Sequence, residues 1–246
     1  MEKQARSQRI NNEFYDDLEE SWYTSWDHPI ALLRAENEVR IPWILKTIPS
    51  RQKVLDLGCG AGMLANALAL EGHLVHGVDL SLKSLQVAKE HDVTQTVVYS
   101  PASALSLPYE DSTFDVTCAM DLLEHVEEPF QVIQEAYRVL KPKGLFFFHT
   151  FNRNLLSYLV IIKGVDWLVP NAPKNMHIYP LFIKPKELEK MFSALGFTIE
   201  CLQGFCPQFF SRAFFKLLLK RKIEKHFPFR FSKNLLTGYC GYAKKE

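Results

Sequence analysis

Three glycines at alternate positions follow a short apolar segment in the first quarter of the chain. Residues 54–57 read as a buried strand, Gly58, Gly60 and Gly62 follow it, and a helical pattern then continues to about residue 71. A strand that turns directly into a helix is the first half of a βαβ unit, which belongs to a parallel sheet. Glycines at such a turn also let a ligand approach bare backbone. The turn therefore predicts an α/β fold with a ligand site beside it.

Strand patterns and helix patterns continue to alternate along the rest of the chain. Six further strands are expected, at residues 74–78, 97–99, 114–119, 144–149, 197–202 and 235–243. Further helices are expected at residues 81–90, 130–140 and 185–195. This order predicts a doubly wound, mostly parallel seven-stranded sheet of Rossmann-like topology.

The whole chain, residues 1–246, is expected to form a single domain with four parts that differ in composition. Two amphipathic helices around an aromatic, acidic patch are expected over residues 11–47. The four parts are a helical arm (1–47), a cofactor-binding core (48–150), an apolar insertion (151–183) and a C-terminal part (184–246) that contains a basic amphipathic segment (209–231).

Composition and charge exclude several classes of protein. Hydrophobic residues make up 47% of the chain and charged residues 23%, which predicts a sizeable core rather than disorder. The net charge of +1 gives no overall attraction to nucleic acid. Five cysteines without a CxxC pair indicate reduced thiols, and the polar N-terminus lacks the apolar core of a secretory signal. We therefore expect a cytoplasmic protein that does not cross a membrane.

A carboxylate closes the strand that follows the glycine turn. Asp79 lies seventeen residues beyond Gly62, where its side chain can accept hydrogen bonds from both hydroxyls of a ribose. The glycines are spaced GxGxG, whereas a dinucleotide-binding turn is spaced GxGxxG. Glycines alone would also suit a tight βα turn without a ligand. Together with Asp79 they predict a nucleoside-bearing cofactor, with S-adenosylmethionine favoured over NAD.

Three polar residues follow the fourth expected strand, at the edge where open α/β sheets bind ligands. Asp121, Glu124 and His125 lie within five residues of one another in the sequence. One helical turn or a tight loop can bring two carboxylates and an imidazole to one point, and such a set suits a divalent cation. In the alternative interpretation, Glu124 is exposed and His125 packs on the cofactor or transfers a proton.

These motifs resemble those of a known family. The segments DLGCGAG and VDLS are similar to the motifs of class I methyltransferases. The segment from Asp121 to Val126, with Pro129 behind it, resembles the E-x-x-E-H-V motif of the ubiquinone-biosynthesis O-methyltransferases. The resemblance extends from about residue 20 to about residue 200, and it departs at Asp121, where the family usually has glutamate.

The resemblance implies a cofactor and the residues that bind it. S-adenosylmethionine would be bound by Arg40, Gly58, Asp79 and Met120, and Gly60 belongs to the same glycine turn. The family has an arginine at the position of Arg40 that contacts the carboxylate of the cofactor. A methionine at a strand end would also be expected as core packing, and an arginine on a helix as a solvated charge.

The resemblance also implies the chemistry. Glu124 and His125 would be catalytic, and Asp121, Glu124 and His125 would bind Mg²⁺ or another divalent cation. The acceptor would be a phenolic hydroxyl of a polyprenylated catechol or hydroxyquinol in ubiquinone biosynthesis. The alternative is another lipid-like or small hydroxylated acceptor, including methylation of a ring carbon. A non-enzymatic cofactor-binding protein is disfavoured by the polar residues beside the glycine turn.

Two apolar segments suggest contact with a membrane. Residues 155–169 are more apolar than an ordinary surface helix. They could lie in a lipid interface, cover the apolar tail of the substrate or pack in the core. Residues 209–223 combine runs of Phe and Leu with Lys216, Lys220, Arg221 and Lys222. That composition favours peripheral attachment to the inner face of a membrane over RNA binding, and a partner-binding helix is the remaining alternative. The sequence leaves the oligomeric state open.

Overall fold

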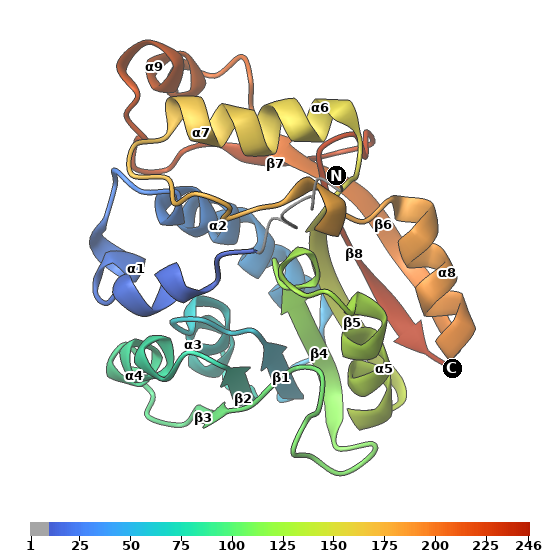
Figure 1. Cartoon of the computed structure of the whole chain (residues 1–246). Coiled ribbons are helices and arrows are strands. Elements are labelled where there is room, and N and C mark those ends of the chain that lie inside the picture. The colour runs from blue at the N-terminus through green and yellow to red at the C-terminus, as the bar shows by residue number, and fades with distance from the viewer. Residues whose placement is uncertain (1–9) are drawn as a thin grey trace, which may run out of the picture.

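An eight-stranded sheet forms the centre of the molecule in the computed structural model, which describes residues 10–246 (Figure 1). The strand order is β3-β2-β1-β4-β5-β8-β6-β7. The pairings among β1 to β5 are parallel, and β8, β6 and β7 extend the sheet in antiparallel fashion. The strands are β1 (Lys53–Leu57), β2 (Leu74–Asp79), β3 (Val98–Pro101), β4 (Phe114–Met120), β5 (Leu140–Phe151), β6 (Phe197–Pro207), β7 (Phe229–Ser232) and β8 (Gly238–Lys245).

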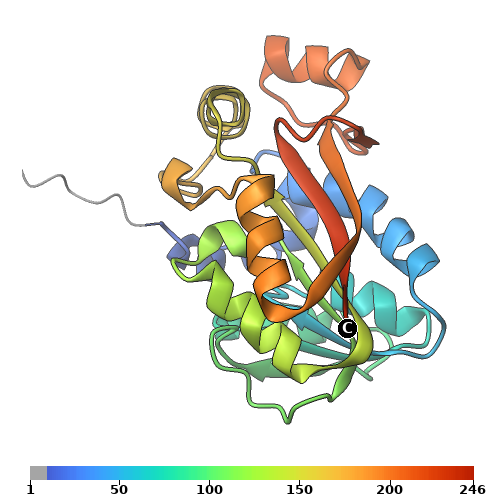
Figure 2. The ribbon, with the colours of Figure 1, turned by 90° about the vertical axis from the view of Figure 1, so that its right-hand side faces the viewer.

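Helices cover both faces of this sheet (Figure 2). One face packs against α2 (Ile30–Thr47), α3 (Met63–Leu70) and α4 (Leu82–Glu90). The other face packs against α5 (Pro129–Val139) and α8 (Pro185–Leu195). Both cores are apolar, with Leu55 and Val54 of the same strand buried on opposite faces. That arrangement is expected for strands of a doubly wound sheet, which are buried on both sides.

Shorter helical segments surround the carboxyl ends of the parallel strands. The arm contributes the 3₁₀ turn η1 (Glu13–Asp17) and α1 (Ser21–Thr24), and η2 (Leu123–His125) follows β4. The segment expected as an apolar insertion forms α6 (Leu155–Ser157), the π-helical η3 (Tyr158–Lys163), α7 (Gly164–Leu168) and the 3₁₀ turn η4 (Tyr179–Leu181). The last helix is α9 (Arg212–Lys220).

The expected fold class is confirmed, and two details differ from the sequence-based expectation. The sheet has eight strands rather than seven, because Phe229 and Phe231 alternate with polar residues and pair with β6 at the sheet edge. The predicted amphipathic segment 209–231 therefore ends in a strand. The arm contains the short helix α1 and the long helix α2, and before them a 3₁₀ turn, η1, that was not expected; its residues 1–9 lie outside the described part. Within residues 10–246, no helix is both long and apolar enough to cross a membrane.

Candidate active site

The glycine turn after β1 adopts the backbone conformation that its sequence predicts. Gly58, Gly60 and Gly62 have φ angles of 65°, 52° and 75°, in the left-handed region where a side chain is strained. A Cβ atom on Gly60 would also come within 2.8 Å of Cη2 of Trp22. Both the backbone angle and the close approach of Trp22 therefore require glycine at this position.

Asp79 ends β2 directly beside the glycine turn. Its Oδ2 accepts a hydrogen bond from the backbone N–H of Gly60, and its Oδ1 accepts one from Ser81, each at 2.9 Å. A carboxylate oxygen has two lone pairs, so each oxygen keeps one acceptor site for a ribose hydroxyl. The turn, Asp79 and the end of β4 meet between β1 and β4, where the strand order reverses and open α/β sheets bind their ligands. These residues fit a nucleoside-bearing cofactor.

Aromatic residues of the arm cover the glycine turn. The ring of Trp22 lies over Gly60, and Tyr15 stacks on Trp22 with their ring centroids 5.5 Å apart. The hydroxyl of Tyr23 donates to the backbone oxygen of Ala61 at 2.8 Å. The arm is therefore part of the wall of this site.

Arg40 is buried behind the carboxyl end of β4, with only 1% of its surface exposed. Its guanidinium donates to Oδ1 of Asp121 and to Oδ1 of Asn37, each at 2.9 Å, and lies 3.2 Å from Oε2 of Glu36. His149 contacts Asp121 from the other side. Burial alone would raise the pKa of Asp121, but Arg40 and His149 lower it below its ordinary range. The carboxylate of Asp121 is therefore ionised and paired with Arg40 and His149.

The structure does not assemble Asp121, Glu124 and His125 into the single ligand set that the sequence motif implies. Asp121 has a φ angle of 59°, a left-handed conformation that is uncommon without glycine, and its carboxylate pairs with Arg40. Donor atoms converge in two other groups, each within 4.8 Å: Glu36, Asp121 and His149 in one, and Glu124, His125 and His177 in the other. The sequence motif does not show this arrangement because it depends on tertiary contacts: Asp121 pairs with Arg40, which comes from α2.

Glu124 and His125 lie together in η2, both buried. Glu124 is 0% exposed, and neither of its carboxylate oxygens has a hydrogen-bond partner among residues 10–246. Burial, and secondarily the charge of Asp121, raises the pKa of Glu124 well above its ordinary value. Burial lowers the pKa of His125 to about 4, so its imidazole is neutral. Met120, predicted to bind the cofactor, is the partly buried last residue of β4.

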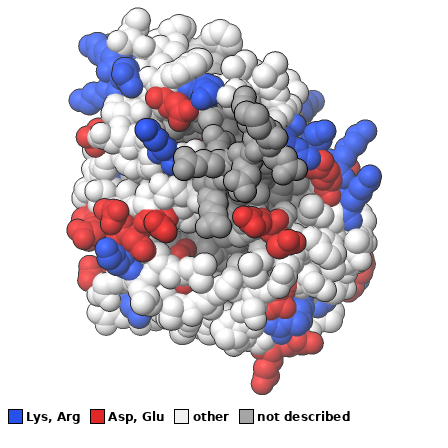
Figure 3. Space-filling model, viewed as in Figure 1, with Lys and Arg blue, Asp and Glu red and all other residues white. Residues whose placement is uncertain are grey.

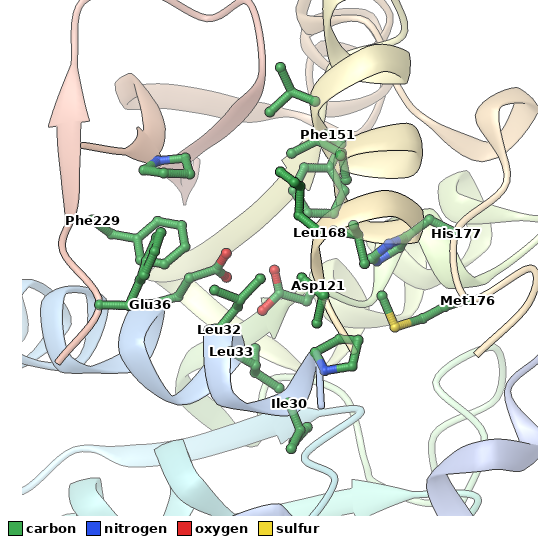
Figure 4. Close-up of a pocket in the computed structure, with 18 of the residues that line it drawn as sticks. Ile30, Leu32, Leu33, Glu36, Asp121, Phe151, Leu168, Met176, His177 and Phe229 are labelled. Atoms are coloured by element: carbon green, nitrogen blue, oxygen red, sulfur yellow. The ribbon is translucent and has the colours of Figure 1, made fainter. Parts of the chain in front are cut away.

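An apolar cavity of about 350 Å³ opens beside these polar groups. Glu36 and Asp121 point toward the same space at its inner end (Figure 4). The apolar walls come from α2, from the helical segment 155–168, from α9 and from the strands β6 and β7. His125, His149 and His177 also line the cavity. A ligand with one polar end and a long apolar part fits such a space.

The sequence did not predict two residues of this site, Glu36 and Asn12, and only Glu36 carries a weak signal. Glu36 precedes Arg40 by four residues, and a carboxylate and an arginine at that spacing share a helix face. Asn12 carries no signal, because its contacts with His125 span 113 residues.

Comparison with known proteins gives the family. The family described as "Methyltransferase domain" matches residues 55–148. The chain is 38% identical to a ubiquinone biosynthesis O-methyltransferase of Thiobacillus denitrificans, over 77% of this chain and 83% of that protein. It is 35% identical to the protein of the same name from Pseudomonas putida, with the same coverage of both chains.

Solved structures show the same fold. An S-adenosylmethionine-dependent methyltransferase from Thermotoga maritima, titled a possible histamine N-methyltransferase, superposes with a TM-score of 0.64 at 18% identity, covering 95% of this chain and 99% of the other. A methyltransferase from Bacillus halodurans, titled putative, superposes with a TM-score of 0.60 at 20% identity, covering 83% and 98%.

The left-handed glycine turn and Asp79 on a doubly wound sheet define an S-adenosylmethionine-dependent methyltransferase. The expected enzyme class and cofactor are confirmed. Within that class, the chain belongs to the ubiquinone biosynthesis O-methyltransferase family.

Proposed function

We propose that the enzyme transfers the methyl group of S-adenosylmethionine to a phenolic hydroxyl of a polyprenylated catechol or hydroxyquinol, in ubiquinone biosynthesis. The names of the relatives support this acceptor. The single structural observation that carries the proposal is the cavity, which has carboxylates and imidazoles at one end and apolar walls along the rest. Each buried CH₂ of a prenyl tail contributes about 0.8 kcal/mol, so such walls favour a tailed acceptor.

The proposal assigns the roles of the site residues. Arg40, Gly58, Gly60, Asp79 and Met120 bind the cofactor. Methyl transfer requires mainly that the sulfonium carbon and the phenolic oxygen be held in line, and that the phenol lose its proton. The polar end of the cavity, which His125 lines, receives the phenolic oxygen, and Glu124 supports His125 from the adjacent position in η2.

Turnover of a His125→Ala variant tests this assignment. We expect that variant to lose turnover while it binds S-adenosylhomocysteine with ordinary affinity in calorimetry. His226→Ala serves as the control, because His226 is exposed and paired only with Glu38. Ordinary turnover of His125→Ala would remove His125 from the chemistry.

A panel of acceptors tests the substrate class. Catechols with and without a short prenyl tail should both be methylated on oxygen, and the tailed compounds should have the lower KM because the cavity walls bind the tail. Mass spectrometry and NMR of the product distinguish methylation of oxygen from methylation of a ring carbon. Equal KM values with and without a tail would contradict the role of the cavity, and a ring-carbon product would contradict the reaction.

We also propose that the enzyme contacts anionic membranes through α9 and its surroundings, from the cytoplasmic side. Phe210 is 91% exposed and Leu219 is 83% exposed. Basic side chains gather over α9 at the upper left of the molecule (Figure 3). Lys220 ends α9, and Arg221 and Lys222 follow it directly. Large apolar side chains beside lysine and arginine are the composition of helices that lie in a lipid interface.

Sedimentation with vesicles of phosphatidylglycerol tests this contact. We expect Phe210→Glu together with Leu219→Glu to lose binding, while Val93→Glu keeps it, because Val93 is 81% exposed in the loop after α4. Salt should weaken binding by the parent protein only in part, since charge attraction is screened over about 8 Å but apolar burial is not. Unchanged binding of the double variant would exclude α9 as the contact.

A further inference from the structure

Gly164 lies in the interior of a helical segment that forms one wall of the cavity. The segment runs without interruption from α6 through η3 to α7, over residues 155–168, and Gly164 has helical backbone angles of φ −62° and ψ −44°. Glycine destabilises a helix relative to alanine, because it loses more conformational freedom on folding. A glycine at this position therefore needs another explanation.

Neither of the two usual reasons for a glycine applies to Gly164. Its φ angle is negative, so the backbone conformation is open to any residue. Outside its own helical turn, a Cβ atom on Gly164 would approach only the backbone oxygen of Leu159 among residues 10–246, at an ordinary contact distance of 3.4 Å. By contrast, a Cβ atom on Gly204 would lie 1.8 Å from the backbone oxygen of Asn234. The protein around Gly164 therefore leaves room for a side chain that the sequence does not supply.

The open space beside Gly164 belongs to the cavity. Gly164 lines the cavity, and so do the residues three and four positions before and after it, which are Val160, Ile161, Trp167 and Leu168. Residues at these spacings are neighbours on one face of a helix. Figure 4 shows Leu168 of this face beside the cavity. Gly164 is therefore at the centre of the helix face that forms the cavity wall.

A π-helical turn directly precedes Gly164. The backbone N–H of Gly164 donates to the oxygen of Leu159, five residues earlier, whereas an α-helical bond spans four residues. Leu159, Val160 and Ile161 of this turn all line the cavity. Single π-helical turns within α-helices are rare and occur frequently at functional sites. Both departures from a regular helix, the wide turn and the glycine, thus lie on the cavity wall.

The helical segment faces the apolar part of a ligand. None of the residues that it contributes to the cavity lining carries a charge. The carboxylates and imidazoles of the lining all come from residues outside the segment, on α2, after β4, in η2, on β5 and in the loop before η4. An acceptor whose phenolic ring lies at the polar end therefore places its prenyl tail against this segment.

We propose that Gly164 determines the tail specificity of the enzyme, because the side chain that it lacks leaves the space in the cavity wall that the prenyl tail occupies. This inference rests on the proposed function, since it takes a prenylated phenol as the ligand. A larger side chain at this position would exclude part of the tail and leave the polar end unchanged. Each methylene of the tail that loses its place in the wall weakens binding about fourfold.

Gly164→Leu tests the proposal with catechols that carry either a geranyl tail or no tail, in the absence of lipid. We expect KM for the geranylated catechol to rise about 15-fold or more, which corresponds to the loss of about two buried methylenes. KM for the untailed catechol, and kcat for both, should change less than threefold. A similar rise of KM for both catechols, or no rise for either, would overturn the proposal.

Asp166→Leu is the matched control for Gly164→Leu. It adds the same side chain to the same helical segment, but Asp166 is exposed and does not line the cavity. We expect this variant to keep the KM of the parent protein for both catechols. If Asp166→Leu raised KM for the geranylated catechol as much as Gly164→Leu does, the effect would not come from the cavity wall and the proposal would fail.

Gly164→Ala tests whether the glycine is kept for the ligand at the expense of stability. Its Cβ atom has room, so the melting temperature should rise by about 2–4 °C because alanine favours the helix. KM for the geranylated catechol should rise by up to about fourfold, because one methyl group enters the cavity. An unchanged or lower melting temperature would show that packing requires the glycine, and would overturn the proposal.

Equilibrium binding separates this inference from the proposed reaction. The Kd of each catechol is measured by calorimetry with S-adenosylhomocysteine present, and binding of S-adenosylhomocysteine shows that each variant is folded. If the parent protein binds the geranylated catechol but methylates neither compound, the proposed reaction fails and the Kd values of Gly164→Leu decide the inference by the same limits. If the parent protein binds both catechols equally, the cavity does not hold the tail and the inference is overturned.

Discussion

Replacement of Asp79 by asparagine tests the cofactor site at its most informative residue. In the parent protein each carboxylate oxygen accepts one backbone N–H, from Gly60 and from Ser81, both at 2.9 Å. Asparagine has nearly the same size, but an NH₂ group replaces one oxygen. One backbone donor then loses its acceptor, and one ribose hydroxyl of the cofactor loses its acceptor too.

The expected magnitude follows from those lost contacts. A hydrogen bond to a charged group contributes about 1.5–3 kcal/mol. Loss of one such bond to the ribose therefore predicts roughly 10- to 150-fold weaker binding of S-adenosylhomocysteine. Isothermal titration calorimetry at one pH and salt concentration measures this change directly.

Asp92 offers a matched control for the variant of Asp79. Its carboxylate also accepts two backbone N–H groups, from Thr94 at 3.0 Å and from Val97 at 2.9 Å, in the loop after α4. Asp92→Asn should lower stability like Asp79→Asn, but it should leave the affinity for S-adenosylhomocysteine unchanged. If both variants bind S-adenosylhomocysteine like the parent protein, the carboxylate of Asp79 is structural only and the reasoning fails.

Two further predictions concern the glycine turn and the strand before it. Burial, and secondarily the charge of Asp79, raises the pKa of Asp56 to about 8, above its unfolded value near 4. As pH rises between these two values, the free energy of unfolding of the parent protein should therefore fall by up to about 1.4 kcal/mol per pH unit. Asp56→Asn should not show this fall when both proteins are unfolded in urea across the same pH range. Parallel pH profiles of the two proteins would contradict the prediction. Gly60→Ala should be destabilised by more than Gly72→Ala, because both have positive φ but only Gly60 lies under Trp22; equal melting temperatures would contradict this.

The fold could be predicted because its signals are local in the sequence. The glycine turn, the strand ends and the helix starts each depend on a few consecutive residues. Ser81, for example, caps α4 by accepting a hydrogen bond from the backbone N–H of Ser84. The edge strand β7 was missed because it spans only Phe229–Ser232 and follows a segment rich in Phe, Leu, Lys and Arg, which conceals an alternating pattern of four residues.

The ligand groups of the site could not be predicted in full, because they depend on contacts between distant parts of the chain. Sequence spacing alone suggested that Asp121, Glu124 and His125 converge. It contained no information that α2 would bring Arg40 to Asp121, across 81 residues, or that the loop after α7 would bring His177 to His125. A buried guanidinium requires a carboxylate partner, and Arg40 pairs with Asp121. The position of Arg40 therefore decides that Glu124 and His125, and not Asp121, remain free for a ligand.

The helix α9 shows why an amphipathic pattern alone could not distinguish a membrane contact from a cavity wall. Phe214 and Leu217 line the cavity, whereas Phe215, Leu218 and Leu219 are exposed. Apolar residues therefore occupy two faces of one helix, and a hydrophobic periodicity reports only that a face is apolar, not what covers it. If lipid covers the outer face as we propose, the same helix would separate the bilayer from the cavity. A prenyl tail would then pass from the membrane into the active site along α9.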